Sequence, residues 1–394
     1  MNGLGVVLAT TAIALGALPM LLALRFRRYV LRELARPPDC YTPKVSVILP
    51  CRGLDPGFEE NIQAIFDQDY PDFEIIFATA TADDEACPAI CGLIQRNARV
   101  PAKLVHAGVS LERGQKVNNQ LRALREVRES TEVLVFVDSD GRPDRGFLRH
   151  LVDPLADRKI GASTGYRWYV PVRGGFGSWL RSTWNAGGIL FLTHPKYNYA
   201  WGGAMAIRRE TFEAAEIASA WQHSISDDMG LTHALRRRGL PIRFVPQCLV
   251  ASEEDSGTLE TIEWTNRQTI IARVYTRDFW MLSASTYALT IAFVAIGAHS
   301  IARFGISAFA VACFFPLFAS FFTSPFILTA ALRMLKGRAH HVVRRGAPRY
   351  LLVAPVAVLL FMVNVVVSMF RSQVTWRGVT YRLHDATRVT VVQS

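Results

Sequence analysis

The 394-residue sequence contains only six cysteines, and it lacks internal repeats and low-complexity tracts. Cys87 and Cys91 are the one close pair of cysteines. A lone C-x-x-x-C with no second pair is a weak indication of a metal site. The spacing therefore favours reduced thiols in a cytosolic domain over a metal site built from cysteines.

A continuous basic patch is also absent, although the formal net charge is +11. Many basic residues instead stand directly beside apolar runs, as in Arg25–Arg36 and Arg333–Arg349. This placement is typical of the positive-inside rule and of an anionic membrane leaflet. We therefore expect a membrane as the partner of these charges, and no nucleic acid.

Long apolar runs are abundant, and 50% of the residues are hydrophobic. Gly3–Leu24 contains 22 residues without a charge, which is long enough to cross a bilayer. A signal peptide is the alternative, but the run exceeds a usual signal core and its basic cluster follows instead of preceding it. We therefore expect a retained anchor over residues 1–25, with the following chain on the cytoplasmic side.

Three further apolar runs lie within residues 279–371. Phe279–Ile301, Phe304–Leu332 and Tyr350–Phe370 are each long enough to span a membrane, with kinks expected at their prolines. Three full crossings would place the basic tail, residues 372–394, outside, against the positive-inside tendency. An interfacial or re-entrant segment among the three is therefore an open alternative.

Residues 40–278 have the composition of a mixed soluble domain. Its short apolar runs are Val45–Pro50, Phe73–Thr79, Ala102–Gly108 and Val133–Val137. The last of these follows a helical pattern over Lys116–Glu129. Strands that alternate with helices at this spacing indicate a doubly wound, mostly parallel sheet.

One pair of carboxylates directly follows an apolar strand. Asp138 and Asp140 come after Val133–Val137, and ligands bind beyond the carboxyl ends of the strands in open α/β sheets. Two carboxylates one residue apart can share a hard divalent cation, and such a cation can bridge a diphosphate. A solvated turn is the alternative, since Asp and Gly are common turn residues.

Two further acidic pairs stand at the ends of predicted elements. Asp83 and Asp84 follow the strand Phe73–Thr79, where a carboxylate can accept a hydrogen bond from a base. Asp227 and Asp228 precede a helical pattern. Helix capping is the alternative for this second pair, but a carboxylate at a helix start is also placed to act as a general base.

Five motifs resemble, in their order along the chain, those of an inverting family 2-type glycosyltransferase with the GT-A fold. They are VSVILPCRG, TADDE, VFVDSDG, WGGAMAIRRETF and SDDMGLTHALRRRG. The flanking apolar segments, together with RQTIIARVY and TWRGVTYR, resemble the ceramide glucosyltransferase branch, of family 21 type. The resemblance covers roughly residues 40–385. It implies an α/β fold, with a Rossmann-like, mostly parallel GT-A catalytic domain and N-terminal and C-terminal transmembrane helices.

The resemblance implies roles for the first two acidic pairs. The early aspartate of the family binds uracil, which matches Asp84, with Asp83 as the near alternative. The D-x-D pair of the family binds the divalent ion, Mg²⁺ or Mn²⁺, and the UDP diphosphate, which matches Asp138 and Asp140.

Further residues match the family by position. The third aspartate of the family deprotonates the acceptor hydroxyl, which matches Asp228, with Asp227 close behind. Lys116 lies where the family often has a lysine near the nucleotide; a solvated lysine at a helix start is the alternative. Gly202 and Gly203 resemble the family's glycine-bearing loop on the sugar side, where a missing side chain lets the backbone approach a ligand. A plain tight turn is the alternative for this pair.

The last motif of the family is incomplete in this sequence. That motif is (Q/R)xxRW, whereas here Arg273 precedes Val274, with Gln268 five residues before Arg273 and no tryptophan. We expect Arg273 to neutralise the UDP leaving group, because a guanidinium pairs well with phosphate, and Gln268 to belong to the same nucleotide-sugar site. Tyr275 and Trp264 are the candidates to replace the missing tryptophan.

These features predict a membrane-bound inverting glycosyltransferase that moves a hexose, with glucose favoured, from a UDP-sugar to a lipid hydroxyl, with a ceramide-like acceptor favoured. A hopanoid or another lipid is an alternative acceptor. A polysaccharide synthase would need more membrane spans and the full tryptophan-bearing motif. A non-catalytic nucleotide-sugar-binding protein is disfavoured by the intact carboxylates. We expect the catalytic domain on the cytosolic side of a bacterial inner membrane or an equivalent membrane.

Overall fold

The computed structural model describes residues 3–37 and 41–393, so Cys40 lies outside the described residues. The chain forms two compact units that alternate along the sequence. The sheet unit contains Glu33–Tyr169, Leu192–Glu254 and Ser372–Ser394. The helical unit contains Met1–Arg32, Val170–Phe191 and Asp255–Arg371.

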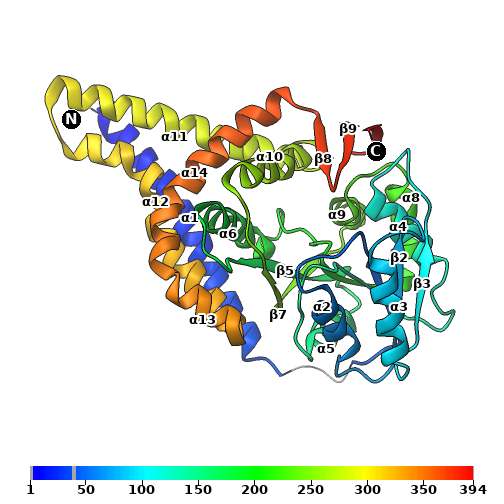
Figure 1. Ribbon diagram of the computed structural model, residues 1–394. Coiled ribbons are helices and arrows are strands. Elements are labelled where there is room, and N and C mark those ends of the chain that lie inside the picture. Colours follow the sequence, from blue (N-terminus) through cyan, green and yellow to red (C-terminus); the bar gives the residue numbers. More distant parts are fainter. Residues whose placement is uncertain (1–2, 38–40, 394) are drawn as a thin grey trace. The chain divides into compact units, whose positions relative to one another are not determined.

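A seven-stranded sheet of order β3-β2-β1-β4-β6-β5-β7 lies at the centre of the sheet unit (Figure 1). Its strands are β1 (Val45–Pro50), β2 (Phe73–Thr79), β3 (Ala102–His106), β4 (Val133–Val137), β5 (Ala162–Val170), β6 (Ala204–Arg208) and β7 (Ile242–Glu253). The pairs β1–β2, β1–β4 and β2–β3 are parallel, and β6 pairs antiparallel with β4 and β5. The predicted fold class, α/β with a mostly parallel sheet, is confirmed.

Helices cover both faces of this sheet. They are α2 (Phe58–Phe66), α3 (Ala86–Arg96), α4 (Gln115–Leu124), α5 (Phe147–Val152), α7 (Arg209–Ala214), α8 (Ile217–Trp221) and α9 (Asp227–Arg237), with the short 3₁₀ turns η1 (Asp153–Ala156) and η2 (Ile189–Thr193). Val47 of β1 packs in one core cluster with residues of α2, α3 and α5, whereas Ile48 packs in a second with residues of α4, α8 and α9. Since successive strand residues point to opposite faces and both are covered, β4 is apolar throughout and β1 and β2 are mostly apolar.

The helical unit contains all the long apolar helices of the described chain. Its helices are α1 (Gly3–Leu34, which ends in the sheet unit), α6 (Phe176–Gly188), α10 (Thr258–Tyr275), α11 (Arg277–Phe304), α12 (Ala308–Met334), α13 (Gly337–Arg345) and α14 (Ala347–Phe370). Among the described residues four helices are long and apolar enough to cross a membrane, by length and composition: α1, α11, α12 and α14. The predicted N-terminal run and the three C-terminal runs coincide with these helices. Their internal prolines lie within continuous helices.

A buried amide joins three helices of the helical unit. Asn364 of α14 is fully buried. Its Oδ1 accepts a hydrogen bond from Trp184 Nε1 of α6 at 3.1 Å, and its Nδ2 donates to Asn266 Oδ1 at 2.7 Å and to Thr265 Oγ1 at 3.1 Å, both of α10. Because a buried amide is costly unless it is hydrogen-bonded, these bonds fix how α14 packs against α6 and α10.

Residues 373–393, within the segment expected as a basic tail, form a second sheet within the sheet unit. Its strands are β8 (Gln373–Trp376), β9 (Val379–Asp385) and β10 (Arg388–Gln393), paired antiparallel in the order β10-β9-β8. Val374, Tyr381, Leu383 and Val389 are buried in this small sheet.

Gly165 of β5 is a point where the sheet has no room for a side chain. An added Cβ would meet the carbonyl oxygen of Cys248 and would lie 3.0 Å from Ala204 Cβ. We expect G165A to destabilise the protein by about 1–3 kcal/mol, the usual cost of overpacking. Thermal unfolding of the detergent-solubilised protein measures this as a lowered Tm.

Gly92 of α3 provides the matched control, because an added Cβ there would meet only the end of the Arg96 side chain, at 3.7 Å. G92A should keep or raise the Tm, since Ala favours the helix by up to about 1 kcal/mol. An equal Tm for both variants would contradict the close packing at Gly165.

Candidate active site

The carboxylates that follow β2 and β4 lie at one edge of the sheet. Since β1, β2 and β4 run parallel, their carboxyl ends meet at the same edge. Asp84 follows β2, and Asp138 follows β4 directly. The second acidic pair, Asp227 and Asp228, begins α9. Lys116 contacts one aspartate of the pair after β4 and one of the pair at the start of α9, so these two acidic pairs lie close to each other.

Lys116, in the first turn of α4, joins the two acidic pairs. Its Nζ lies 2.7 Å from Asp138 Oδ1 and 3.0 Å from Asp227 Oδ2, and donates to the carbonyl oxygen of Gly202 at 3.2 Å. Burial lowers the pKa of Lys116, but Asp138, Asp227 and Asp228 outweigh burial and raise it. The structure thus surrounds this ammonium group with carboxylates.

Arg167 of β5 occupies the space between the two carboxylates of the D-x-D stretch. Its Nη2 lies 2.9 Å from Asp138 Oδ2 and 2.5 Å from Asp140 Oδ1, and its Nη1 donates to Asp140 Oδ2 at 2.8 Å. The guanidinium also lies over the ring of Trp201, 5.0 Å from its centroid, an arrangement that favours a cation. Burial raises the pKa of Asp138, but Lys116 and Arg167 outweigh it, so that this carboxyl stays ionised.

The sequence reasoning missed Arg167. The signal was present, because Arg167 stands inside the aromatic strand segment YRWYV, where a charge must find partners once buried. Arg167 is 7% exposed.

Gly202 and Gly203 bring backbone against the charged side chains. A Cβ at Gly202 would lie 2.7 Å from Asp227 Oδ2 and 2.8 Å from Lys116 Nζ. A Cβ at Gly203 would lie 2.7 Å from Asp138 Oδ2 and would also meet the ring of Trp201. Both positions therefore require glycine for close approach.

The two aspartates of α9 have different surroundings. Asp227 is buried, and its Oδ2 accepts a hydrogen bond from Gln120 Nε2 at 2.8 Å besides its contact with Lys116. Asp228 is partly exposed, and its carboxylate accepts from the backbone N–H of Gly202 at 3.2 Å and of Met229 at 2.7 Å, and from the Ser226 hydroxyl. Ser226 also caps the helix through Met229 N, so Asp228 is not needed as the helix cap.

Burial and the neighbouring Asp227 raise the pKa of Asp228 to about 6, against the lowering influence of Lys116, Ser226 and the Gly202 N–H. A carboxyl group with this pKa is deprotonated near neutral pH and still basic enough to accept a proton. Of the two aspartates, Asp228 therefore has the better properties for a general base.

Asp84 holds the backbone between two strand ends. Its Oδ1 accepts hydrogen bonds from the N–H groups of Gly53, after β1, at 2.8 Å and of Ala86 at 3.0 Å. Asp83 is exposed, and a hydrogen bond from Thr81, with one from its own backbone, lowers its pKa. Asp84 is thus the member of this pair that shapes the strand edge.

Gln268 and Arg273 lie on α10 of the helical unit, not in the sheet unit. Arg273 Nη2 donates to the carbonyl oxygen of Arg371 at 3.1 Å. Tyr275 is buried, and Trp264 stacks edge-on against Trp184 with ring centroids 5.3 Å apart. The roles expected for these residues stay predictions.

Asp138 and Asp140 fit a divalent cation by donor chemistry. The described residues contain no group of three or more His, Cys, Asp or Glu that could hold a metal on its own. All four carboxylate oxygens of Asp138 and Asp140 contact Lys116 or Arg167 in this structure, so an ion bound between the two aspartates would take the place of the Arg167 guanidinium. Hard carboxylate oxygens suit Mg²⁺ or Mn²⁺, with further oxygen ligands supplied by a diphosphate and water.

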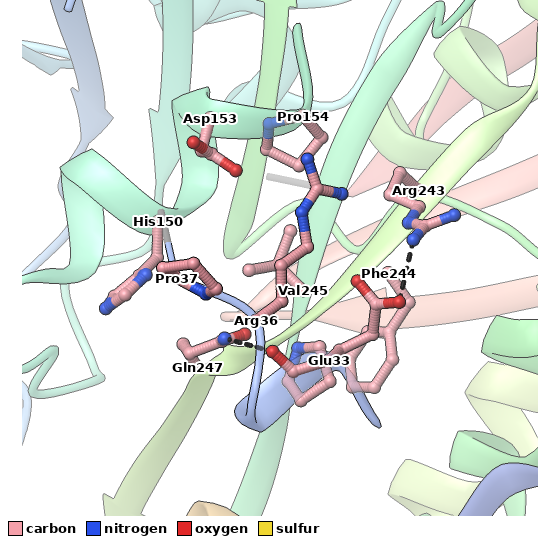
Figure 2. A pocket seen from close by; sticks show the side chains of 11 residues that line it. Glu33, Arg36, Pro37, His150, Asp153, Pro154, Arg243, Phe244, Val245 and Gln247 are labelled. Atoms are coloured by element: carbon pink, nitrogen blue, oxygen red, sulfur yellow. Dashed lines mark hydrogen bonds and ion pairs between the residues drawn. The ribbon is translucent and has the colours of Figure 1, made fainter. Parts of the chain in front are cut away.

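A separate pocket of the sheet unit contains none of the predicted residues (Figure 2). It lies between the end of α1, α5 with the turn after it, and β7. Arg243 Nη2 lies 2.8 Å from Glu33 Oε1, and Gln247 Nε2 donates to the carbonyl oxygen of Glu33 at 2.9 Å. These contacts join the end of α1 to β7.

D228N should be more stable than the wild type above about pH 6. The pKa of Asp228 is raised from its ordinary 3.8 to about 6, so the folded protein retains a proton that the unfolded chain releases between these values. The cost of the buried charge is therefore absent at low pH, grows as the pH rises to about 6, and is constant above it. The Tm of D228N relative to wild type should rise between pH 4 and pH 7.

Asp67, exposed at the end of α2, gives the matched control. D67N replaces an exposed aspartate outside this cluster and should leave the Tm near that of the wild type. A difference between D228N and the wild type that is the same at every pH would contradict the raised pKa of Asp228.

Comparison with known proteins identifies the family. A family model described as glycosyl transferase family 21 matches residues 7–389. Ceramide glucosyltransferase 1 of Caenorhabditis elegans is 32% identical over 130 residues, 32% of this chain and 27% of that protein. Ceramide glucosyltransferase of Komagataella phaffii is 30% identical over 115 residues, 28% of this chain and 22% of that protein. The chain therefore aligns with about a quarter of the length of these curated relatives.

Among solved structures, the mannosyltransferase PcManGT from Pyrobaculum calidifontis, in complex with GDP-Man and Mn²⁺, matches with a TM-score of 0.47 and 19% identity, covering 92% of this chain and 97% of that chain. The family match, which extends over nearly the whole chain, shows that the chain belongs to glycosyl transferase family 21.

Proposed function

We propose that the protein transfers a hexose, with glucose favoured, from a UDP-sugar to the hydroxyl group of a membrane lipid, with a ceramide-like lipid favoured, and inverts the anomeric configuration. The observation that carries this proposal is Asp228. It is a partly exposed carboxylate with a pKa of about 6, held beside a cluster of buried charges at the carboxyl edge of the sheet. The family membership and the ceramide glucosyltransferase relatives support the same reaction class.

The proposed chemistry is a single displacement. Asp228 takes the proton from the acceptor hydroxyl as its oxygen bonds to the anomeric carbon, and the bond from that carbon to the diphosphate oxygen breaks. Lys116 lies between the carboxylates that flank the proposed donor site and keeps them at fixed distances. Asp84, with Asp83 as its neighbour, is proposed to contact the uracil, and Gly202 and Gly203 to leave room for the sugar.

Asp138 and Asp140 would hold the Mg²⁺ or Mn²⁺ ion. When bound, the ion supplies charge stabilisation to the departing diphosphate. Arg273, with Gln268, is proposed to neutralise the same leaving group through its guanidinium.

D228N should lower the rate of hexose transfer by about 10²–10⁴-fold, because the general base is lost. UDP affinity should stay within about twofold, since Asp228 acts on the acceptor. For the wild type, kcat/KM should rise with pH up to about 6 and then level off, following the pKa of Asp228. Mass spectrometry of lipid products formed in detergent from a panel of UDP-sugars and lipid extracts, with and without EDTA, provides the measurement.

D67N serves as the control for an aspartate substitution and should retain wild-type transfer. Near-normal turnover by folded D228N would exclude the proposed base. Polymer formation without any lipid product would favour a polysaccharide synthase, and UDP-sugar binding without transfer or hydrolysis would favour a non-catalytic protein.

We also propose a membrane arrangement with the sheet unit on the cytosolic side. Residues 33–169 and 372–394 belong to one compact unit, so both stand on the same side of the membrane. The chain between residues 255 and 371 must then cross an even number of times. The helices α11 and α12 pack against each other and are joined by the short segment 305–307, which suits a crossing pair.

On this arrangement α13 and both ends of α14 face the cytosol. Arg338, Arg344 and Arg345 of α13 are exposed, which agrees with the positive-inside tendency. Because α14 is one continuous helix, it would then be the interfacial segment.

Fusions of green fluorescent protein and of alkaline phosphatase test this arrangement. A fluorescent protein fused after residue 394 should fluoresce and a phosphatase there should be inactive, because both would stay in the cytosol. A phosphatase inserted at residues 305–307 should be active and serves as the positive control. An active phosphatase after residue 394 would mean that α14 crosses the membrane.

A further inference from the structure

The turn between β8 and β9 contains a residue that such turns do not favour. Trp376 pairs with Val379, so Arg377 and Gly378 form a two-residue turn, with φ of 46° and 80°. Turns with two positive φ values favour Asn-Gly, and an arginine side chain is disfavoured in this left-handed region. Among the described residues only Glu216 and Arg377 are non-glycine residues with positive φ. An unfavoured side chain at an exposed turn suggests that the side chain itself is needed.

The Arg377 side chain contacts the segment after β1. Its Nη1 donates to the carbonyl oxygen of Arg52 at 2.8 Å, and its Nη2 lies 2.6 Å from Asp55 Oδ1. The Asp55 side chain is 9% exposed, and its second oxygen accepts a hydrogen bond from the Ser139 hydroxyl at 2.7 Å. Since Ser139 stands between Asp138 and Asp140, two bonds connect the turn with the D-x-D stretch.

The same hairpin contacts the start of α4. The Tyr381 hydroxyl oxygen of β9 accepts a hydrogen bond from the backbone N–H of Gln115 at 3.2 Å, and Tyr381 is buried. Gln115 directly precedes Lys116. The hairpin therefore contacts the start of α4 directly, and it is connected with the D-x-D stretch through Asp55. Side chains of these two segments meet in the Lys116–Asp138 ion pair.

The charge around Arg377 agrees with this placement. Burial lowers the pKa of Arg377, but Asp55, and then Asp140 and Asp138, outweigh burial and raise it. The guanidinium thus lies within electrostatic range of the D-x-D carboxylates as well as in contact with Asp55.

We propose that the β8–β9 hairpin is part of the donor site and that Arg377 is a positioning residue for the nucleoside diphosphate. Arg377 holds Asp55, Asp55 holds Ser139, and Ser139 fixes the backbone between the two aspartates that face the diphosphate. This inference deepens the proposed function and rests on a UDP-sugar as the donor. It assigns a role to the TWRG segment near the carboxyl-terminal end of the chain.

The variant R377N distinguishes a positioning role of Arg377 from a role in the overall stability of the protein. Asparagine is favoured before glycine in this turn, so the hairpin and the Tm should be kept or improved. The Kd for UDP with Mg²⁺, measured by calorimetry on the full-length protein in detergent, should rise about tenfold, as expected for one lost charge-assisted pair. The KM for the UDP-sugar should rise by the same factor with kcat within about twofold.

Hydrogen exchange, measured in the absence of nucleotide, tests the connection between Arg377 and the D-x-D stretch. The amides of residues 138–141 should exchange faster in R377N than in the wild type, because Asp55 no longer has its partner. R377K should restore part of the UDP affinity, since it keeps the charge but not the two-pronged contact. D55N should resemble R377N, and the double variant should be no worse than either single variant, because both act through one contact.

R388Q is the matched control. Arg388 is an exposed arginine of the same small sheet, and its Nε lies 3.9 Å from Asp385 Oδ2, within that sheet. R388Q should leave the Kd for UDP, the KM and the exchange of residues 138–141 unchanged.

Three results would overturn the inference. The first is wild-type affinity for UDP in folded R377N. The second is unchanged hydrogen exchange at residues 138–141. The third is a fall in Tm that accounts for a rise in KM and an equal fall in kcat. A wild-type protein that binds no UDP would instead refute the proposed donor, while the exchange measurement would still decide whether Arg377 positions the D-x-D stretch.

Discussion

The ion pair between Lys116 and Asp138, at 2.7 Å, is the contact on which the site depends. It joins the start of α4 to the end of β4, and the 3.0 Å contact of Lys116 with Asp227 adds the start of α9. Without the ammonium group, the buried carboxylate of Asp227 would lose its contact with a cation, which is strongly unfavourable in a protein interior. Gly202 and Gly203 are required by the same contact, because any side chain there would displace the charged atoms.

Cationic side chains compensate the negative charges of Asp138, Asp140, Asp227 and Asp228 to different degrees. These four carboxylates therefore differ in their chemistry. Asp138 contacts both Lys116 and Arg167, so its pKa is lowered despite burial. Asp228 accepts neutral hydrogen bonds from Gly202, Met229 and Ser226, and burial and Asp227 raise its pKa to about 6. One cluster therefore contains carboxylates suited to binding a cation and one suited to accepting a proton.

Much of the sheet and its acidic edge could be predicted from local patterns. The strands before Asp84 and Asp138 were recognisable as apolar runs, because both faces of the sheet are buried. Arg167 and Asp55 could not be assigned in this way, because their partners come from distant segments. The hairpin of residues 372–394 was expected only as a basic tail, since the pairing of Arg377 with Asp55 joins residues 322 positions apart. A short pattern contains no information about such a pairing.

The order of segments along the chain has a consequence for how the site is completed. The chain leaves the sheet unit after residue 254, forms α10 to α14, and returns at residue 372 to contact Asp55 and Gln115. Closing so long a loop costs conformational entropy that only the returning contacts can offset. The hairpin therefore compensates with buried residues such as Tyr381 and Val374 as well as with the Arg377 ion pair. During synthesis, the D-x-D stretch gains its connection to Arg377 through Asp55 only after the four long apolar helices of the described residues have been made.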